Sequence, residues 1–187
     1  MPSSALNLWQ TDRMPRLAQV ETQCAAVFAL VPPNPQLAEE DLRGYVVLLS
    51  AHFQGFCREL YVECAQIVVS KVRSSLRFLF ERQFTEKLKL DHGNPNIDNI
   101  AEDFNRFGVD VIGTARADPA FAVHRQHLVE LNKWRNTVAH HGPSPRGLPG
   151  LTLALVASWR ISCDGLAASL TEIMYNQLRR ILKRAPW

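Results

Sequence analysis

Long hydrophobic runs are missing from this sequence. No stretch approaches the roughly 18 consecutive apolar residues that indicate a transmembrane helix. The segment from Met1 to Gln10 also lacks the basic start and apolar stretch of a secretory signal. We therefore expect a soluble, cytoplasmic protein with no membrane partner.

Cysteine is scarce and is not spaced for zinc binding. There are four cysteines and no Cys-x-x-Cys motif. Most of them lie in apolar, helix-like surroundings, so we expect reduced, buried thiols. His124 and His127 have the spacing of two metal ligands on one helix, but the sequence offers no third ligand. We favour a core histidine at His124 and expect no metal. The four cysteines are Cys24, Cys57, Cys64 and Cys163.

Phosphate-binding glycine loops are also missing, which argues against a P-loop or a dinucleotide-binding fold. No arrangement of Ser, His and Asp, or of Cys and His, resembles an activated nucleophile. We therefore expect no cofactor.

What is present suffices for one hydrophobic core. The 187 residues (21.1 kDa) are 47% hydrophobic and 21% charged, which predicts a single domain over residues 1–187. The net charge of +3 permits a polyanionic partner without demanding one. Basic residues gather in 71–89 and 176–187; we favour solvent-exposed helix faces there, with phosphate contact as the alternative.

Apolar residues recur every three or four positions along almost the whole chain, which is the α-helical period. Two segments depart from it: 109–112 fits an extended segment, and 151–161 fits either a short strand or the approach to the last helix. We predict an all-α bundle of five or six helices, with an N-terminal helix at about 16–30 and a core bundle at about 38–184. The expected helices cover 16–30, 38–72, 74–90, 96–107, 119–141 and 164–183.

The chemically informative segment is the end of the helix expected over 119–141. At about 100° per residue, Arg135 falls near the middle of its apolar stripe, where a guanidinium is costly unless it is paired or faces a cleft. Asn136 and His140 are four residues apart and share one flank. Gly142 and Pro143 then end the helix, so His140 and His141 lie in its last turn.

A fixed cation, an amide and an imidazole on one helix suit the cleavage of RNA without a metal. His140 can move a proton to or from the 2′-hydroxyl or the leaving oxygen. Arg135 can stabilise the negative charge that develops on the phosphate, and Asn136 can hold a phosphate oxygen or orient the imidazole. The structural alternative is an interior Arg135 paired with a carboxylate such as Glu59, and a His140 that only caps the helix.

The order of these features resembles the HEPN superfamily. The resemblance rests on the segment 51–56 (Ala-His-Phe-Gln-Gly-Phe) in the long helix, on 107–110 (Phe-Gly-Val-Asp) and on 131–142, and it covers roughly Ala38 to the C-terminus. It is closest to the small bacterial members labelled RiboL-PSP-HEPN. The family signature is Arg, a polar residue, a few residues and then His, which Arg135, Asn136 and His140 match.

The resemblance implies an all-α bundle that dimerises so that two such helices line one cleft. It also implies a metal-independent endoribonuclease that acts in a toxin–antitoxin, defence or stress setting. RNA, a second copy of the chain and a cognate antitoxin protein are the implied partners.

Two departures from the family pattern affect what is carried over. Related toxins have a modifiable Tyr two positions after the His, where this chain has Gly142, so we do not predict that form of control. Relatives also have an acidic residue where this chain has Gln54, which leaves open whether a carboxylate assists His140. Arg58 and Glu59 are nearby alternatives on the same helix. The residues that could support catalysis are His52, Gln54, Glu59 and His141.

The leading prediction is RNA cleavage by Arg135, Asn136 and His140 through attack of the 2′-hydroxyl, which leaves a 2′,3′-cyclic phosphate. A non-catalytic HEPN module for dimerisation or binding is the main alternative. A protein that binds a ligand in an apolar groove, without RNA, is a third.

Overall fold

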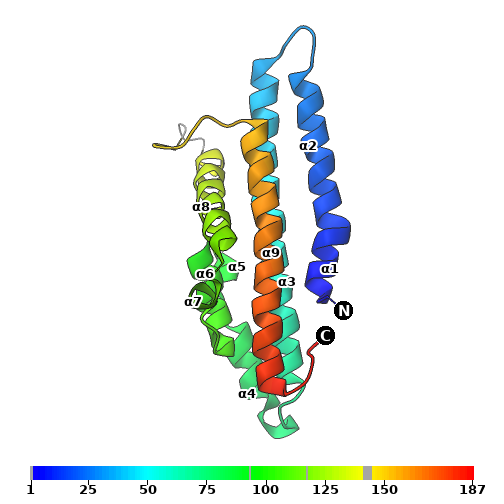
Figure 1. Cartoon of the computed structure of the whole chain (residues 1–187), viewed down its shortest axis with the longest axis vertical. Coiled ribbons are helices and arrows are strands. Elements are labelled where there is room, and N and C mark those ends of the chain that lie inside the picture. Colours follow the sequence, from blue (N-terminus) through cyan, green and yellow to red (C-terminus); the bar gives the residue numbers. More distant parts are fainter. Residues whose placement is uncertain (1, 93, 117, 141–144) are drawn as a thin grey trace.

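The fold is an elongated helical bundle, seen in a computed structural model that describes residues 2–92, 94–116, 118–140 and 145–187 (Figure 1). Its long helices are α2 (Met14–Phe28), α3 (Pro35–Val69), α8 (Pro119–Ala139) and α9 (Leu153–Leu182). No strand occurs in these ranges, which confirms the all-α prediction, but they contain more helices than the five or six predicted, because several short helices lie between the long ones. The short elements are α1 (Ser4–Leu8), η1 (Trp9–Arg13), α4 (Ser74–Thr85), α5 (Lys89–His92), α6 (Ile97–Phe104), η2 (Asn105–Phe107) and α7 (Val111–Ala115).

The core forms where α3 packs against α9, α8 and α2. The apolar residues whose spacing predicts the long helix face the core. Leu42, Leu49, Phe53 and Leu60 are all fully buried. Aromatic rings from distant segments meet in this core, such as Tyr61 of α3 with Phe104 and Phe107 at centroid distances of 5.5 and 5.2 Å. The prediction of reduced, buried thiols is confirmed, because all four cysteines are buried and free.

The last helix begins eleven residues earlier than predicted, at Leu153 rather than Asp164. Thr152 caps it, since its hydroxyl accepts a hydrogen bond of 3.2 Å from the backbone N–H of Leu155. Val156 and Trp159 are buried at helical spacing, so the strand interpretation of 151–161 is wrong. The alternation of Leu and small residues in this segment resembles a strand pattern, but the N-cap at Thr152 starts a helix here.

Helix α9 is long and apolar enough to cross a membrane, by length and composition only. Core helices of soluble proteins pass the same test. Its inward residues, including Leu166, Leu170 and Met174, belong to the hydrophobic core.

The N-terminal helix also starts earlier than predicted. Ser3 accepts a hydrogen bond from the Leu6 N–H, and helical structure continues from α1 through the π-turn η1 into α2. Pro15 lies just after this turn, where the Met14 N–H bonds the Trp9 carbonyl. A proline has no N–H to donate, and the wider turn accommodates it. Trp9 is therefore a core residue, and its indole N–H donates to Asp164 at 2.9 Å.

The segment 109–112 is only partly extended. Val109 and Asp110 are not helical, but Asp110 caps α7 through a hydrogen bond of 2.8 Å from the Gly113 N–H. The residues after Asp110 therefore form a short helix rather than the extended segment expected there.

Candidate functional site

Helix α8 carries the Arg135, Asn136 and His140 signature. Asp118 caps its start and Pro119 occupies its first turn, where the missing N–H costs nothing. The helix packs mainly against α9 and α3. It ends at Ala139, and the backbone N–H of His140 bonds the Asn136 carbonyl at 3.1 Å. His141 lies outside the described residues.

Arg135 is half-buried rather than central in a buried stripe. The inward side of α8 changes along the helix: near the start it is Phe121 and Leu128, and near the end it is Leu131 and Trp134. This shift leaves Arg135 at the edge of the buried face. Within the described ranges its guanidinium has no carboxylate partner; it donates a long 3.4 Å bond to Oδ1 of the neighbouring Asn136. Glu59, the carboxylate suggested for it, is paired with Arg13 instead.

Asn136 is exposed and is held by a loop from another part of the chain. The side-chain N–H of Asn94 donates to its Oδ1 at 2.6 Å. Next to it, the side-chain N–H of the buried Asn132 donates to the Pro95 carbonyl at 3.4 Å, while its Oδ1 has no partner among the described residues. Two asparagines of α8 therefore fasten the segment 94–96 to the helix.

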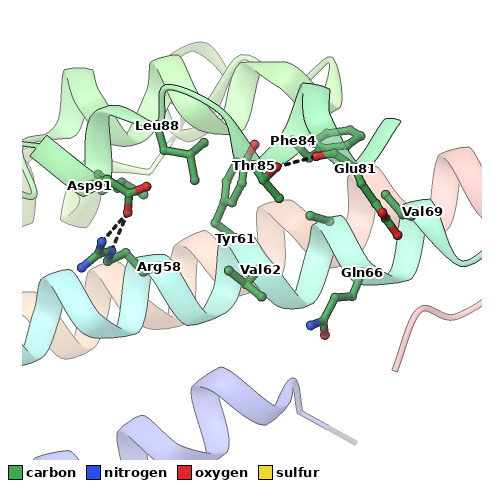
Figure 2. Close-up of a pocket in the computed structure, with 12 residues that line it drawn as sticks. Arg58, Tyr61, Val62, Gln66, Val69, Glu81, Phe84, Thr85, Leu88 and Asp91 are labelled. Carbon is green, nitrogen blue, oxygen red and sulfur yellow. Dashed lines mark hydrogen bonds and ion pairs between the residues drawn. The ribbon is translucent and has the colours of Figure 1, made fainter. Parts of the chain in front are cut away.

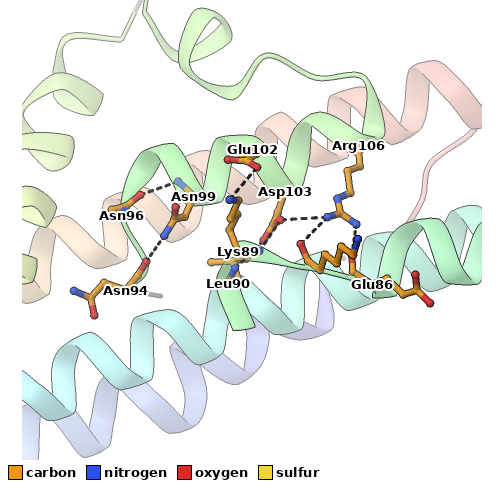
Figure 3. A network of polar contacts seen from close by, with 10 residues as sticks. Glu86, Lys89, Leu90, Asn94, Asn96, Asn99, Glu102, Asp103 and Arg106 are labelled. Atoms are coloured by element: carbon orange, nitrogen blue, oxygen red, sulfur yellow. Dashed lines mark hydrogen bonds and ion pairs between the residues drawn. The ribbon is translucent and has the colours of Figure 1, made fainter. Parts of the chain in front are cut away.

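That segment is itself rigidly anchored. Figure 3 shows Asn99 donating to the Asn94 carbonyl at 3.1 Å, and Asn96 accepting from the Asn99 backbone at 2.7 Å. On the other side, the fully buried Asp103 accepts hydrogen bonds from the Lys89 and Leu90 backbone N–H groups at 3.0 and 2.9 Å. Hydrogen bonds from α6 and α8 thus hold the segment 94–96 beside Asn136.

His140 is exposed and follows the last residue of α8 as its C-cap, one turn beyond Asn136. Its imidazole has no hydrogen-bond partner in the part of the chain that the structure describes. None of the described side chains therefore occupies either ring nitrogen.

Of the supporting residues predicted on α3, Gln54 contacts α5, the short helix that precedes this loop in the chain. Its side-chain N–H donates to the Leu90 carbonyl at 2.8 Å. Arg58, one turn further on, pairs with Asp91. His52 and Glu59 contact Arg13 of the N-terminal segment: its guanidinium donates to the His52 carbonyl at 3.2 Å and pairs with Glu59. Burial, followed by the charges of Arg13 and Arg16, lowers the pKa of the His52 imidazole.

Sequence reasoning missed Asn94 and Asn132 as site residues. The signal for Asn94 was the turn-rich run from Asp91 to Pro95, which marks a loop but does not say what the loop touches. Asn132 has no signal other than a polar residue on an apolar face.

A hollow of about 440 Å³ lies between α3 and α4, with Leu90 and Asp91 among its lining residues (Figure 2). Its walls are mostly apolar, with Tyr61, Val62 and Phe84 among them, and the Arg58–Asp91 ion pair closes one end. It contains no residue of α8 and no histidine, so it adds nothing to the proton-transfer chemistry of the candidate site.

The two other histidines of α8 share one hydroxyl. Nδ1 of His124 and Nδ1 of His127 lie 3.1 and 2.7 Å from Oγ of the buried Ser162. His124 is therefore hydrogen-bonded, but it is half-buried rather than the core residue favoured above. Among the residues that can be described, no group of three or more His, Cys, Asp or Glu side chains could hold a metal ion.

Comparisons with protein-family models, with curated proteins and with solved structures give no significant match to this chain.

Proposed function

We propose that the protein is a metal-independent endoribonuclease of the HEPN type that works as a cytoplasmic homodimer. The observation that carries the proposal is the state of Arg135. Its guanidinium is half-exposed, has no carboxylate partner among the described side chains, and lies beside Asn136 and one turn before His140. A cation left without a counter-charge next to an accessible imidazole suits a phosphodiester.

The proposed reaction divides the work among these three side chains. His140 takes the proton of the 2′-hydroxyl as its oxygen attacks phosphorus, or returns a proton to the 5′-oxygen as the phosphorus–oxygen bond to it breaks. Arg135 stabilises the added charge on the non-bridging oxygens. The products are a 2′,3′-cyclic phosphate and a 5′-hydroxyl.

Asn136 has a more specific role than the sequence suggested. Its Oδ1 already accepts hydrogen bonds from Asn94 and Arg135. The Nδ2 group is therefore the end of the amide that can donate to a phosphate oxygen. We assign Asn136 to phosphate binding rather than to orienting the imidazole.

The second copy would bring its own α8 to the same cleft, as in the superfamily that the sequence resembles. A toxin–antitoxin, defence or stress setting, with a cognate antitoxin protein, belongs to the same proposal.

The test is incubation of total RNA with purified wild type and with the variants Arg135→Ala, Asn136→Ala and His140→Ala, in excess EDTA. We expect cleavage with cyclic-phosphate ends by wild type, and a loss of at least roughly 100-fold for the Arg135 and His140 variants. Lys133→Ala is the matched control, because Lys133 is an exposed cation on the same helix. A folded, dimeric wild type that leaves all RNA intact would support the non-catalytic binding module instead.

A further inference from the structure

Helix α4 exposes four large apolar side chains within five consecutive residues. The exposed fractions are 45% for Leu76, 70% for Phe78, 60% for Leu79 and 41% for Phe80. Single exposed apolar residues are ordinary on protein surfaces, but a contiguous group marks an interaction surface.

The geometry of α4 shows which way this group faces. Phe84 is its buried residue and fixes the side turned to the bundle. Leu79 precedes Phe84 by five positions and Phe78 by six, which places them about 140° and 120° around the helix from it. These two side chains therefore point away from the core.

Exposed cations lie near this apolar group, at the end of the bundle where α3 is followed by α4. The segment 70–80 contains three, Lys71, Arg73 and Arg77, and no acidic residue. Figure 1 shows that α9 ends at the same end of the molecule as the α3–α4 turn. Its last turn and the following residues add four exposed cations, together with Ile181, which is 46% exposed. These four are Arg179, Arg180, Lys183 and Arg184.

No carboxylate within the described ranges pairs with any of these seven cations. By contrast Arg82, further along α4, is paired with Glu86 at 2.7 Å. The charge at this end is thus left open for an external anion.

The combination of exposed apolar side chains and unpaired cations favours one kind of partner. A second copy docking by the same end would oppose like charges across the contact. RNA would use the cations and the rings of Phe78 and Phe80, but it offers nothing to bury the aliphatic Leu76, Leu79 and Ile181. An anionic bilayer uses both features, because its headgroups attract the cations while its acyl region takes up Phe and Leu side chains.

We propose that this end of the bundle, formed by 71–80 and 179–184, binds the surface of anionic membranes. The contact is peripheral and spans nothing, so the lack of a long hydrophobic run does not exclude it. It revises the expectation of no membrane partner, and it is independent of RNA cleavage at α8.

The test is flotation of the full chain with phosphatidylcholine vesicles and with equimolar phosphatidylcholine–phosphatidylglycerol vesicles. We expect binding only to the second kind. Arg73→Gln with Arg77→Gln should lower the partition coefficient by roughly 30-fold. Phe78→Ser with Leu79→Ser should lower it by at least roughly tenfold.

Matched controls lie elsewhere on the surface. Ile161→Ser removes an apolar side chain that is 60% exposed on α9, like Leu79, and Arg116→Gln with Lys133→Gln removes two exposed cations; both should bind as wild type does. Equal binding to both vesicle types, or equal losses in test and control variants, would overturn the proposal. So would dissociation of a dimer by the Phe78/Leu79 pair, or loss of RNA binding by both test pairs without any vesicle binding by wild type.

Discussion

The side chain of Asn94 donates a hydrogen bond of 2.6 Å to Oδ1 of Asn136, across 42 positions of sequence. This bond joins the loop before α6 to the last turns of α8. It also decides which end of the Asn136 amide faces outward.

The first prediction concerns this bond. Asn94→Ala removes the donor and lets the Asn136 amide rotate, so we expect RNA cleavage to fall about tenfold, the equivalent of about 1.4 kcal/mol in the transition state. Because both side chains are partly exposed, the thermal midpoint should fall by only a few degrees. Rates of RNA cleavage and thermal unfolding by circular dichroism check the two parts.

Asn105→Ala serves as the control, since Asn105 is an exposed asparagine at the far end of α6. Unchanged cleavage by Asn94→Ala would mean that Asn136 does not need the loop.

The second prediction concerns Asp103, which is fully buried and binds the backbone N–H groups of Lys89 and Leu90. Asp103→Ala leaves the Leu90 N–H buried without a partner, so we expect a loss of about 3 kcal/mol in the free energy of unfolding. Asp98→Ala removes an exposed carboxylate on the same helix and should cost less than about 0.5 kcal/mol. Urea unfolding of both variants measures the difference, and similar losses would contradict the anchoring role.

The helices that could be predicted from the sequence are those whose burial is continuous. In α3 the apolar side faces the core along most of its length, so the period alone locates it. The Thr152 cap sets the early start of α9, and a π-turn before Pro15 lets the N-terminal helix begin early. The spacing of apolar residues indicates neither feature.

The candidate site divides in the same way. Neighbours on one helix, such as Arg135 and Asn136, follow from helical spacing. Partners from other segments do not follow from spacing. The sequence allows Glu59 as the counter-ion of Arg135, but in the structure Glu59 pairs with Arg13, which lies before the helix expected at 16–30. Contacts of this kind depend on tertiary packing, which patterns in a single sequence do not indicate.

The third prediction compares two glycines inside long helices. At Gly44 of α3 nothing lies within 4 Å of an added Cβ, so Gly44→Ala should raise the free energy of unfolding by about 0.5–1 kcal/mol. At Gly165 of α9 the added Cβ would collide with Nε2 of His124, whose Nδ1 is bonded to Ser162. Gly165→Ala should therefore be about 2 kcal/mol less stable than Gly44→Ala.

Urea unfolding of both variants gives the comparison, and His124→Ala added to Gly165→Ala supplies the control. The double variant should lose most of the penalty, because the colliding ring is gone. A Gly165→Ala protein as stable as Gly44→Ala would show that the His124 ring moves aside without cost.

The fourth prediction concerns alkaline pH. Burial raises the pKa of the Cys57, Cys64 and Cys163 thiols well above the ordinary value. Above about pH 8.5 these thiols lose their protons in the unfolded chain but keep them in the folded protein. The folded state then binds more protons, so stability falls as pH rises. Each thiol should lower the free energy of unfolding by about 2 kcal/mol between pH 8 and pH 10.

Urea unfolding of wild type and Cys163→Ala at both pH values tests this. The variant is less stable at pH 8 because of its cavity, but its further loss of stability up to pH 10 should be smaller by about 2 kcal/mol. An equal loss in both proteins would mean that the Cys163 thiol ionises as readily in the folded state as in the unfolded one.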